Sequence, residues 1–177
     1  MTIEAMEEQV ILVDEADQPV GLMGKYQAHA EGRLHRAISV LVYDRHGRWL
    51  LQRRAMSKYH SGRLWTNACC SHPRDGEQPA AAAERRLMEE MGFTTSVNFI
   101  GTVRYCSDLD RGMIENELVH VFTARFNGAI VPNPDEVEGY DWVFESELRD
   151  DIKARPERYT VWFKKYVDEL KEQLSAA

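Results

Sequence analysis

A histidine and two adjacent cysteines lie close together in the segment WTNACCSHP, residues 65–73. If this segment is extended, alternate side chains point to opposite faces, so Cys70 and His72 share one face and Cys69 points to the other. We expect Cys69 to pack in the core, which is the commonest place for a free cysteine. Cys70 then lies beside His72, where a neighbouring cation would lower the pKa of its thiol and make it a competent acid, base or nucleophile.

The number and spacing of the cysteines argue against a disulfide framework and against a zinc finger. The chain has three cysteines, and two adjacent ones make a poor framework for disulfides. A zinc finger would need a second Cys/His pair at a suitable distance, and the sequence offers none. The chemistry of the segment therefore depends on partners elsewhere in the chain.

Glu115 and Glu117, in the segment IENELVHVF, are the first candidate partners. Residues two apart on a strand point to the same face, and two buried carboxylates repel each other unless a cation lies between them. On an exposed edge the pair would need no cation, and the segment alone leaves both alternatives open. Three imidazoles and two carboxylates would suit a divalent ion such as Mn²⁺, Mg²⁺ or Zn²⁺. The histidines that could join them are His29, His35 and His72.

The other three histidines are weaker candidates for such a site. His46 lies in the turn DRHG and is expected in solvent. His120 follows Glu117 by three residues, so it points to the opposite face of the strand. His60 lies in an apparent loop and has no partner in the sequence.

Basic side chains form a local exception to the acidic balance of the chain. On a strand, Arg53 and Arg54 face opposite ways, so at most one of them points into a given site. Arg86 shares a helix face with Glu90, which lies four residues further on. These cations, together with Lys25 and Lys58, are either solvated surface charges or the walls of a pocket for a phosphorylated anion.

Length and charge narrow the class of protein. A chain of 177 residues is most simply one domain with a real core, and we expect a single domain over residues 1–177. The net charge of −7 gives no indication of general binding to nucleic acid or membranes. No apolar run approaches the roughly 20 residues needed to span a bilayer, and the segment MTIEAMEEQV lacks the apolar core of a signal peptide. We expect a cytoplasmic protein and a monomer.

Strand-forming and helix-forming segments alternate irregularly along the chain, which predicts an α+β fold with a mixed sheet packed between helices. Two β-rich runs, 33–44 and 49–55, are expected to form a hairpin through the turn DRHGR. The helix within 75–93 is the clearest, because Pro79 can begin it and Gly92 can end it. The other expected strands are 8–21 with its turn, 97–107, 115–126 and 136–144, and the other expected helices are 23–30 and 155–174.

The segment that contains this helix resembles the Nudix box, commonly written G-x5-E-x7-R-E-U-x-E-E-x-G-U, with U an apolar residue. Two positions depart from it: Ser71 stands at the first glycine, and Arg86 stands where glutamate follows the arginine. A cation in place of an acid weakens any multi-metal cluster on this helix face, which counts against diphosphate hydrolysis. The matching residues are Glu77, Arg85, Leu87, Glu89, Glu90, Gly92 and Phe93.

A narrower resemblance accounts for these departures. The runs KYQAH, RLH, RRAMSK, WTNACCSHP, GE, RRLMEEMG and ENE are similar, in order and spacing, to those of type I isopentenyl diphosphate isomerases. The resemblance covers the chain from about Lys25 to Trp162, and the combination of TNACCSHP with ENE is highly specific. It implies a Nudix-like fold, with a mixed sheet sandwiched between helices. It also implies isomerisation of isopentenyl diphosphate to dimethylallyl diphosphate, in which one proton is added and another is removed.

The resemblance assigns roles to particular residues. Cys70 and Glu117 would be the catalytic pair, with Tyr105 assisting proton transfer. Trp162 would lie near the hydrocarbon, where its π face could stabilise a carbocation, or would instead anchor the C-terminal helix in the core. The substrate diphosphate would be held by Lys25, Arg54, Lys58 and Arg86. One divalent metal, Mn²⁺, Mg²⁺ or Zn²⁺, would be bound by His29, His35, His72, Glu115 and Glu117.

A second ion, Mg²⁺, would arrive with the diphosphate and bind Glu90, joined by the backbone carbonyl of Cys70. Two alternatives to the isomerase stay open. A Nudix hydrolase acting on a nucleoside or prenyl diphosphate would release phosphate, tolerate Cys70→Ala and be sensitive to loss of Glu89. A non-catalytic metal- or diphosphate-binding module would bind without turnover, and it would give no reason for Cys70 beside His72.

Overall fold

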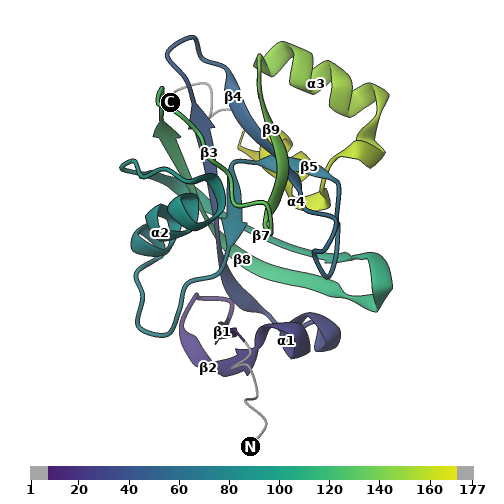
Figure 1. Ribbon diagram of the computed structural model, residues 1–177. Helices are drawn as coiled ribbons and strands as arrows, with labels where there is room; N and C mark the ends of the chain where they lie inside the picture. Colours follow the sequence, from purple (N-terminus) through teal and green to yellow (C-terminus); the bar gives the residue numbers. More distant parts are fainter. Residues whose placement is uncertain (1–7, 171–177) are drawn as a thin grey trace, which may run out of the picture.

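The computed structural model describes residues 8–170, and over this part of the chain it forms one mixed sheet with helices on both faces (Figure 1). The strands are β1 (Gln9–Val13), β2 (Pro19–Gly24), β3 (His35–Tyr43), β4 (Trp49–Arg54), β5 (Trp65–Asn67), β6 (Cys69–Ser71), β7 (Asn98–Asp108), β8 (Ile114–Arg125) and β9 (Val137–Val143). The helices are α1 (Lys25–Glu31), α2 (Pro79–Met91), α3 (Glu145–Ala154) and α4 (Val161–Glu169), with short 3₁₀ turns η1 (Asp110–Gly112) and η2 (Pro156–Arg158).

Strand β3 lies at the centre of the sheet and places most of the other strands. It runs parallel to β8 over its full length, from the pair His35↔Glu117 to the pair Tyr43↔Arg125. It also pairs antiparallel with β6, where Ser39 lies opposite Cys70. The first residue of β3 is therefore placed beside β8, and β3 lies between β8 and the CCS segment, although these segments are far apart in the sequence.

Alternate side chains of β3 pack against helices on opposite faces of the sheet, as the period of a strand requires. Ile38 and Val40 belong to the core cluster that contains the buried residues of α2, such as Leu87. Ala37 and Leu41 belong to the cluster that contains the buried residues of α4. The expected α+β sandwich, with a mixed sheet between helices, is confirmed.

The expected hairpin between 33–44 and 49–55 is wrong beyond its turn. β3 and β4 pair at Tyr43↔Trp49, and then they diverge. β4 instead pairs with β5 and along its length with β9, while β6 and β8 pair with β3. A turn signal predicts where the chain reverses, but the partners of a strand are decided by segments far away.

The helix predictions hold in part. α2 begins with Pro79, and Gly92 follows it in the left-handed conformation at φ 74°, with its N–H donating to the carbonyl of Met88. The C-terminal helix begins at Val161 rather than near 155, because η2 precedes it; the expected end at 174 lies outside the described residues. Helix α3 was not predicted, since it buries little apolar surface. No helix between residues 8 and 170 is long and apolar enough to cross a membrane.

Candidate active site

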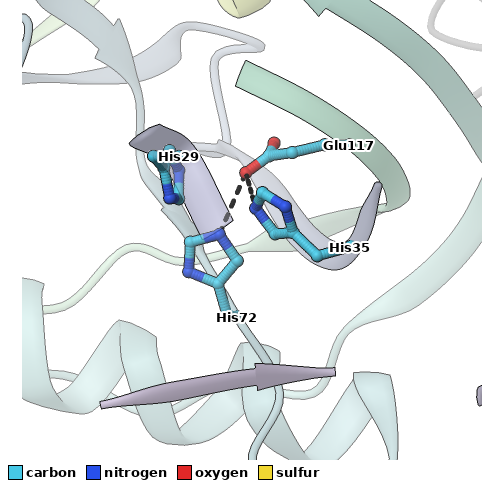
Figure 2. Close-up of side chains that lie close together, drawn as sticks. All are labelled: His29, His35, His72 and Glu117. Carbon is cyan, nitrogen blue, oxygen red and sulfur yellow. Dashed lines mark hydrogen bonds and ion pairs between the residues drawn. The ribbon is translucent and has the colours of Figure 1, made fainter. Parts of the chain in front are cut away.

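Three histidines and a glutamate from four separate parts of the fold converge in the interior (Figure 2). The β3–β8 register places His35 beside Glu117, while His29 comes from α1 and His72 directly follows β6. Each of the four is at most 5% exposed. One ligand atom from each lies within 4.8 Å of all the others. Glu117 Oε1 is 2.9 Å from His72 Nε2 and 3.4 Å from His35 Nε2.

Backbone carbonyls orient two of these imidazoles. His29 Nδ1 lies 2.7 Å from the carbonyl oxygen of Lys25, and His35 Nδ1 lies 2.7 Å from that of Arg33. A carbonyl oxygen accepts, so each Nδ1 carries the proton and each Nε2 offers a lone pair to the cluster. His35 Nε2 and His72 Nδ1 make no hydrogen bond within the described part of the chain. Buried unpaired nitrogens are costly, and imidazoles oriented in this way are typical of metal ligands. The cluster therefore fits a divalent metal ion.

Glu115 belongs to an adjoining group, formed with His29 and His60, whose ligand atoms also lie within 4.8 Å of one another. The nearest oxygen of Glu115 is 3.7 Å from His29 Nε2. Burial and the charge of Glu117 raise the pKa of Glu115, and its Oε2 has no hydrogen-bond partner among the described residues. Burial lowers the pKa of His60 to about 3, so its ring is neutral. Sequence reasoning missed His60, because its partners come from α1 and β8.

The two adjacent cysteines face opposite sides of the sheet, as expected. Cys69 is fully buried in the core cluster beneath α2, with its Sγ 3.6 Å from Glu90 Oε1. Cys70 packs on the α4 side, where its thiol donates to Asn67 Oδ1 at 3.1 Å and lies 3.5 Å from Ser39 Oγ. In the absence of a metal, burial raises the pKa of the Cys70 thiol to about 12. The thiol is then protonated at neutral pH, which is the form of a proton donor.

Tyr105 completes the surroundings of Glu117. It is the register partner of Glu117 in the β7–β8 pair, and its buried hydroxyl donates to Glu117 Oε2 at 3.1 Å. Burial raises the pKa of Tyr105 well above its usual value, so the phenol stays a donor. One oxygen of Glu117 thus faces the imidazoles, and the other is held by Tyr105. His120 lies on the opposite face of β8 as expected, with its Nε2 2.7 Å from Asp17.

A narrow cavity is lined both by residues of this cluster and by the basic side chains that the sequence suggested for a phosphorylated anion. Its free volume is about 30 Å³, which is room for roughly one water molecule, so a larger ligand enters only if side chains move. Trp162 lines it and is also 3% exposed in the core, with its indole N–H donating to Thr66 Oγ1 at 3.0 Å. Trp162 is thus a core residue that also lines the cavity, and its place near a hydrocarbon stays a prediction. The lining includes Cys70, His72, Glu115 and Glu117 with Lys25, Arg54, Lys58 and Arg86.

Most of these cations are paired with carboxylates. Lys25 Nζ is 2.9 Å from Glu8, and Lys58 forms an ion pair with Glu136. Arg54 points inward, with its guanidinium 5.2 Å from the centre of the Trp162 ring. Arg53 does not line the cavity and instead pairs with Glu138, in agreement with the prediction that only one of the two arginines points into the site. A diphosphate would compete with these carboxylates for the cations.

Arg86 lies between the cavity and the carboxylates of α2. Its guanidinium donates to Glu90 Oε1 and Glu89 Oε2, both at 2.7 Å. Gln52 donates to the other oxygen of Glu90 at 2.8 Å. Glu90 is 5% exposed and is not part of the cavity lining. An ion that binds Glu90 must therefore displace Arg86 from it.

Reversing the charge of Arg86 should destabilise the fold. Arg86→Glu places a third carboxylate beside Glu89 and Glu90, and breaking a buried ion pair costs about 3–5 kcal/mol. Urea denaturation should show this loss of unfolding free energy, and Mg²⁺ should recover part of it by binding the gathered carboxylates. Arg53→Glu, which removes an exposed pair with Glu138, should cost less than about 1 kcal/mol. Equal stability of the two variants would contradict a buried role for Arg86.

Comparisons with known proteins identify the family of the chain. The NUDIX domain family matches residues 33–163. The chain is 50% identical over 165 residues to isopentenyl-diphosphate Delta-isomerase 2 of Aromatoleum aromaticum, covering 93% of this chain and 87% of that protein. It is 48% identical over 168 residues to the protein of the same name from Photorhabdus laumondii, covering 95% of each.

Solved structures support the fold alone. A Deinococcus radiodurans protein, DR0079, superposes with a TM-score of 0.70 at 19% identity, covering 84% of this chain and 90% of that one. A MutT protein from Methanosarcina mazei has a TM-score of 0.66 at 17% identity, covering 79% and 94%. Given the sequence identity, the matched domain and the shared fold, the chain belongs to the isopentenyl-diphosphate Delta-isomerase family of NUDIX-domain proteins.

Proposed function

We propose that this chain converts isopentenyl diphosphate to dimethylallyl diphosphate, with Cys70 and Glu117 as the proton-transfer pair. The observation that carries the proposal is that a protonated thiol and a buried carboxylate line the same narrow cavity, beside four cations. Burial raises the pKa of Cys70. The pKa of Glu117 is lowered despite its burial, chiefly by the neighbouring imidazole of His35, whose Nε2 lies 3.4 Å from Glu117 Oε1. The pair therefore holds one proton, and the reaction needs one donor and one acceptor.

The proposed chemistry moves a double bond without net oxidation. One member of the pair gives a proton to the terminal methylene carbon, and the electrons of the C=C bond form the new C–H bond. The tertiary carbocation that results loses a proton from the adjacent methylene to the other member, and those C–H electrons form the new double bond. The Trp162 ring, which lines the cavity, is placed to stabilise the cation. A substrate that fills this narrow cavity would leave little room for water that could trap the cation.

The basic side chains and the metal ligands would bind different partners in this reaction. Lys25, Arg54, Lys58 and Arg86 would bind the diphosphate. His29, His35, His72, Glu115 and Glu117 would hold a divalent ion, Mn²⁺, Mg²⁺ or Zn²⁺, which fixes the orientation and charge of Glu117. A Mg²⁺ ion brought by the diphosphate would bind Glu90 and the Cys70 carbonyl once Arg86 turns toward the phosphates.

Hydrolysis of a diphosphate is the second candidate, and the contacts of α2 disfavour it. Metal-dependent hydrolysis needs carboxylates that are free to gather metal ions around the phosphates. Arg85 donates to Glu77 at 2.7 Å and to Glu89 at 3.0 Å. Arg86 donates to Glu90 at 2.7 Å. Glu77, Glu89 and Glu90 are thus paired with arginines of α2.

Proton NMR in D₂O separates the candidates. Purified protein is incubated with isopentenyl diphosphate, Mg²⁺ and Mn²⁺, and we expect dimethylallyl diphosphate with solvent deuterium in a methyl group. Release of phosphate or pyrophosphate without isomerisation would favour the hydrolase. Binding of the substrate without any turnover, with both metals present, would favour the binding module.

Tyr105→Phe should lower kcat while the protein stays folded. The substitution removes the hydroxyl that holds Glu117 Oε2 and keeps the buried ring. Loss of a group that orients a metal ligand typically costs about 10- to 100-fold in activity or metal affinity. Steady-state isomerase kinetics measure the effect, and a wild-type kcat would contradict a role for Tyr105 in positioning Glu117.

A further inference from the structure

His60 is a buried histidine of the cavity to which the proposed reaction gives no role. It lies on the loop between β4 and β5 and is 4% exposed. One of its ring nitrogens lies within 4.8 Å of the ligand atoms of both His29 and Glu115. Its ring is stacked on that of His29, with the centroids 5.6 Å apart and an interplanar angle of 27°. The ring is thus placed at the edge of the metal-binding cluster.

The loop holds His60 in place by several contacts from other elements. The Arg54 guanidinium donates to the carbonyls of His60 and Ser61, both at 3.2 Å. The backbone of Ser61 has a φ of 51°, and its N–H donates to Asp110 at 2.8 Å. A non-glycine residue in the left-handed region is held there at a cost, and such positions cluster at functional sites. The orientation of His60 is therefore determined by the fold.

Glu115 supplies a second, independent observation. It is 5% exposed, and its Oε2 makes no hydrogen bond within residues 8–170. A buried carboxylate oxygen without a partner is costly, and a cation between Glu115 and His60 would satisfy it. His29 Nδ1 donates to a carbonyl, so its Nε2 has one lone pair for one ion. The group with His60 and the group with His35 have His29 in common, so an ion bound to that nitrogen would be the one that both groups surround.

We propose that His60 is a further ligand of the ion held by the histidine–glutamate cluster, giving that ion four imidazoles and two carboxylates. This proposal deepens the proposed metal site and extends it by one residue. Mg²⁺ prefers oxygen ligands, whereas imidazole suits first-row transition ions. The class of ion favoured is therefore a transition metal such as Mn²⁺, Fe²⁺, Co²⁺ or Zn²⁺. The ligand also ties the loop that carries Lys58 to the metal centre.

Metal binding by the full chain tests this directly. Metal-free protein is titrated with Co²⁺, and the Kd and visible absorption spectrum are measured for wild type, His60→Phe and His60→Gln. Phenylalanine keeps the stacked ring without a donor atom, while the glutamine amide keeps an oxygen donor. We expect His60→Phe to weaken Co²⁺ binding by about 10- to 100-fold and to change the spectrum, with a smaller loss for His60→Gln. His46→Phe, at an exposed turn, is the matched control and should bind as wild type.

The outcomes distinguish ligation from packing. If His60→Phe binds Co²⁺ with the wild-type Kd and spectrum, His60 is a packing residue and the proposal fails. If His60→Phe does not fold, as judged by urea denaturation of the metal-free protein, the spectrum of His60→Gln decides. An unchanged spectrum in that variant overturns the proposal. Isomerase turnover is not part of the readout, so failure of the proposed function would leave this result interpretable.

Discussion

Cys70→Ala should lose isomerisation by about 10²- to 10⁴-fold, the range that a positioned acid or base contributes. The thiol is partly buried and donates to Asn67, and the substitution removes the one proton that the pair with Glu117 holds. The fold should survive, because the side chain is small and lines a cavity. The measurement is the rate at which solvent deuterium enters dimethylallyl diphosphate, followed by NMR.

The adjacent cysteine provides a matched control. Cys69→Ala removes the same thiol one residue away, on the α2 side of the sheet, so it should keep nearly wild-type turnover. Glu89→Gln should also be tolerated, because Glu89 accepts hydrogen bonds from Arg85 and Arg86 and does not line the cavity. If instead Cys70→Ala retained turnover and Glu89→Gln abolished it, the hydrolase would be the better interpretation of this chain.

The parts of the site that could be predicted from the sequence are those governed by the period of a strand. Cys69 and Cys70 face opposite sides, as do Glu117 and His120 on β8. The two-residue repeat is a property of the backbone itself, so it needs no knowledge of distant partners. The start and end of α2 were predictable for a similar reason, since a proline and a glycine act on their own turns.

Predictions that depend on distant partners were less secure. The hairpin after β3 fails because β6 and β8 pair with β3, and nothing in the turn DRHGR encodes that competition. The place of His60 beside His29 and Glu115 depends on how a loop, a helix and a strand meet. The spacing of these residues along the chain does not indicate that the three elements come together. The three histidines that the family resemblance assigned lie close together with Glu117, and their role as metal ligands stays a prediction.

Glu117→Gln should reduce isomerisation by about 10²- to 10⁴-fold as well, and it should also weaken binding of the divalent ion. The amide keeps the size of the side chain but cannot act as a base, and it loses the charge that faces His35 and His72. Turnover and the Kd for Mn²⁺ are measured on the same preparation. Glu115 lies two residues away on the same face but has no hydrogen bond with Tyr105. Glu115→Gln should therefore weaken Mn²⁺ binding, while turnover at saturating Mn²⁺ should change little.

Saturation with Mn²⁺ separates the two roles of Glu117. If the carboxylate transfers a proton, turnover of Glu117→Gln stays low even when the site is filled, because the ion cannot replace a group that exchanges protons with carbon. If turnover returns to the wild-type rate once Mn²⁺ is saturating, Glu117 serves as a ligand alone and the base must be sought elsewhere in the cavity. The two oxygens of Glu117 have different partners, with Oε1 near His35 and His72 and Oε2 held by Tyr105. The carboxylate therefore has one oxygen that these two imidazoles do not occupy, which favours the first result.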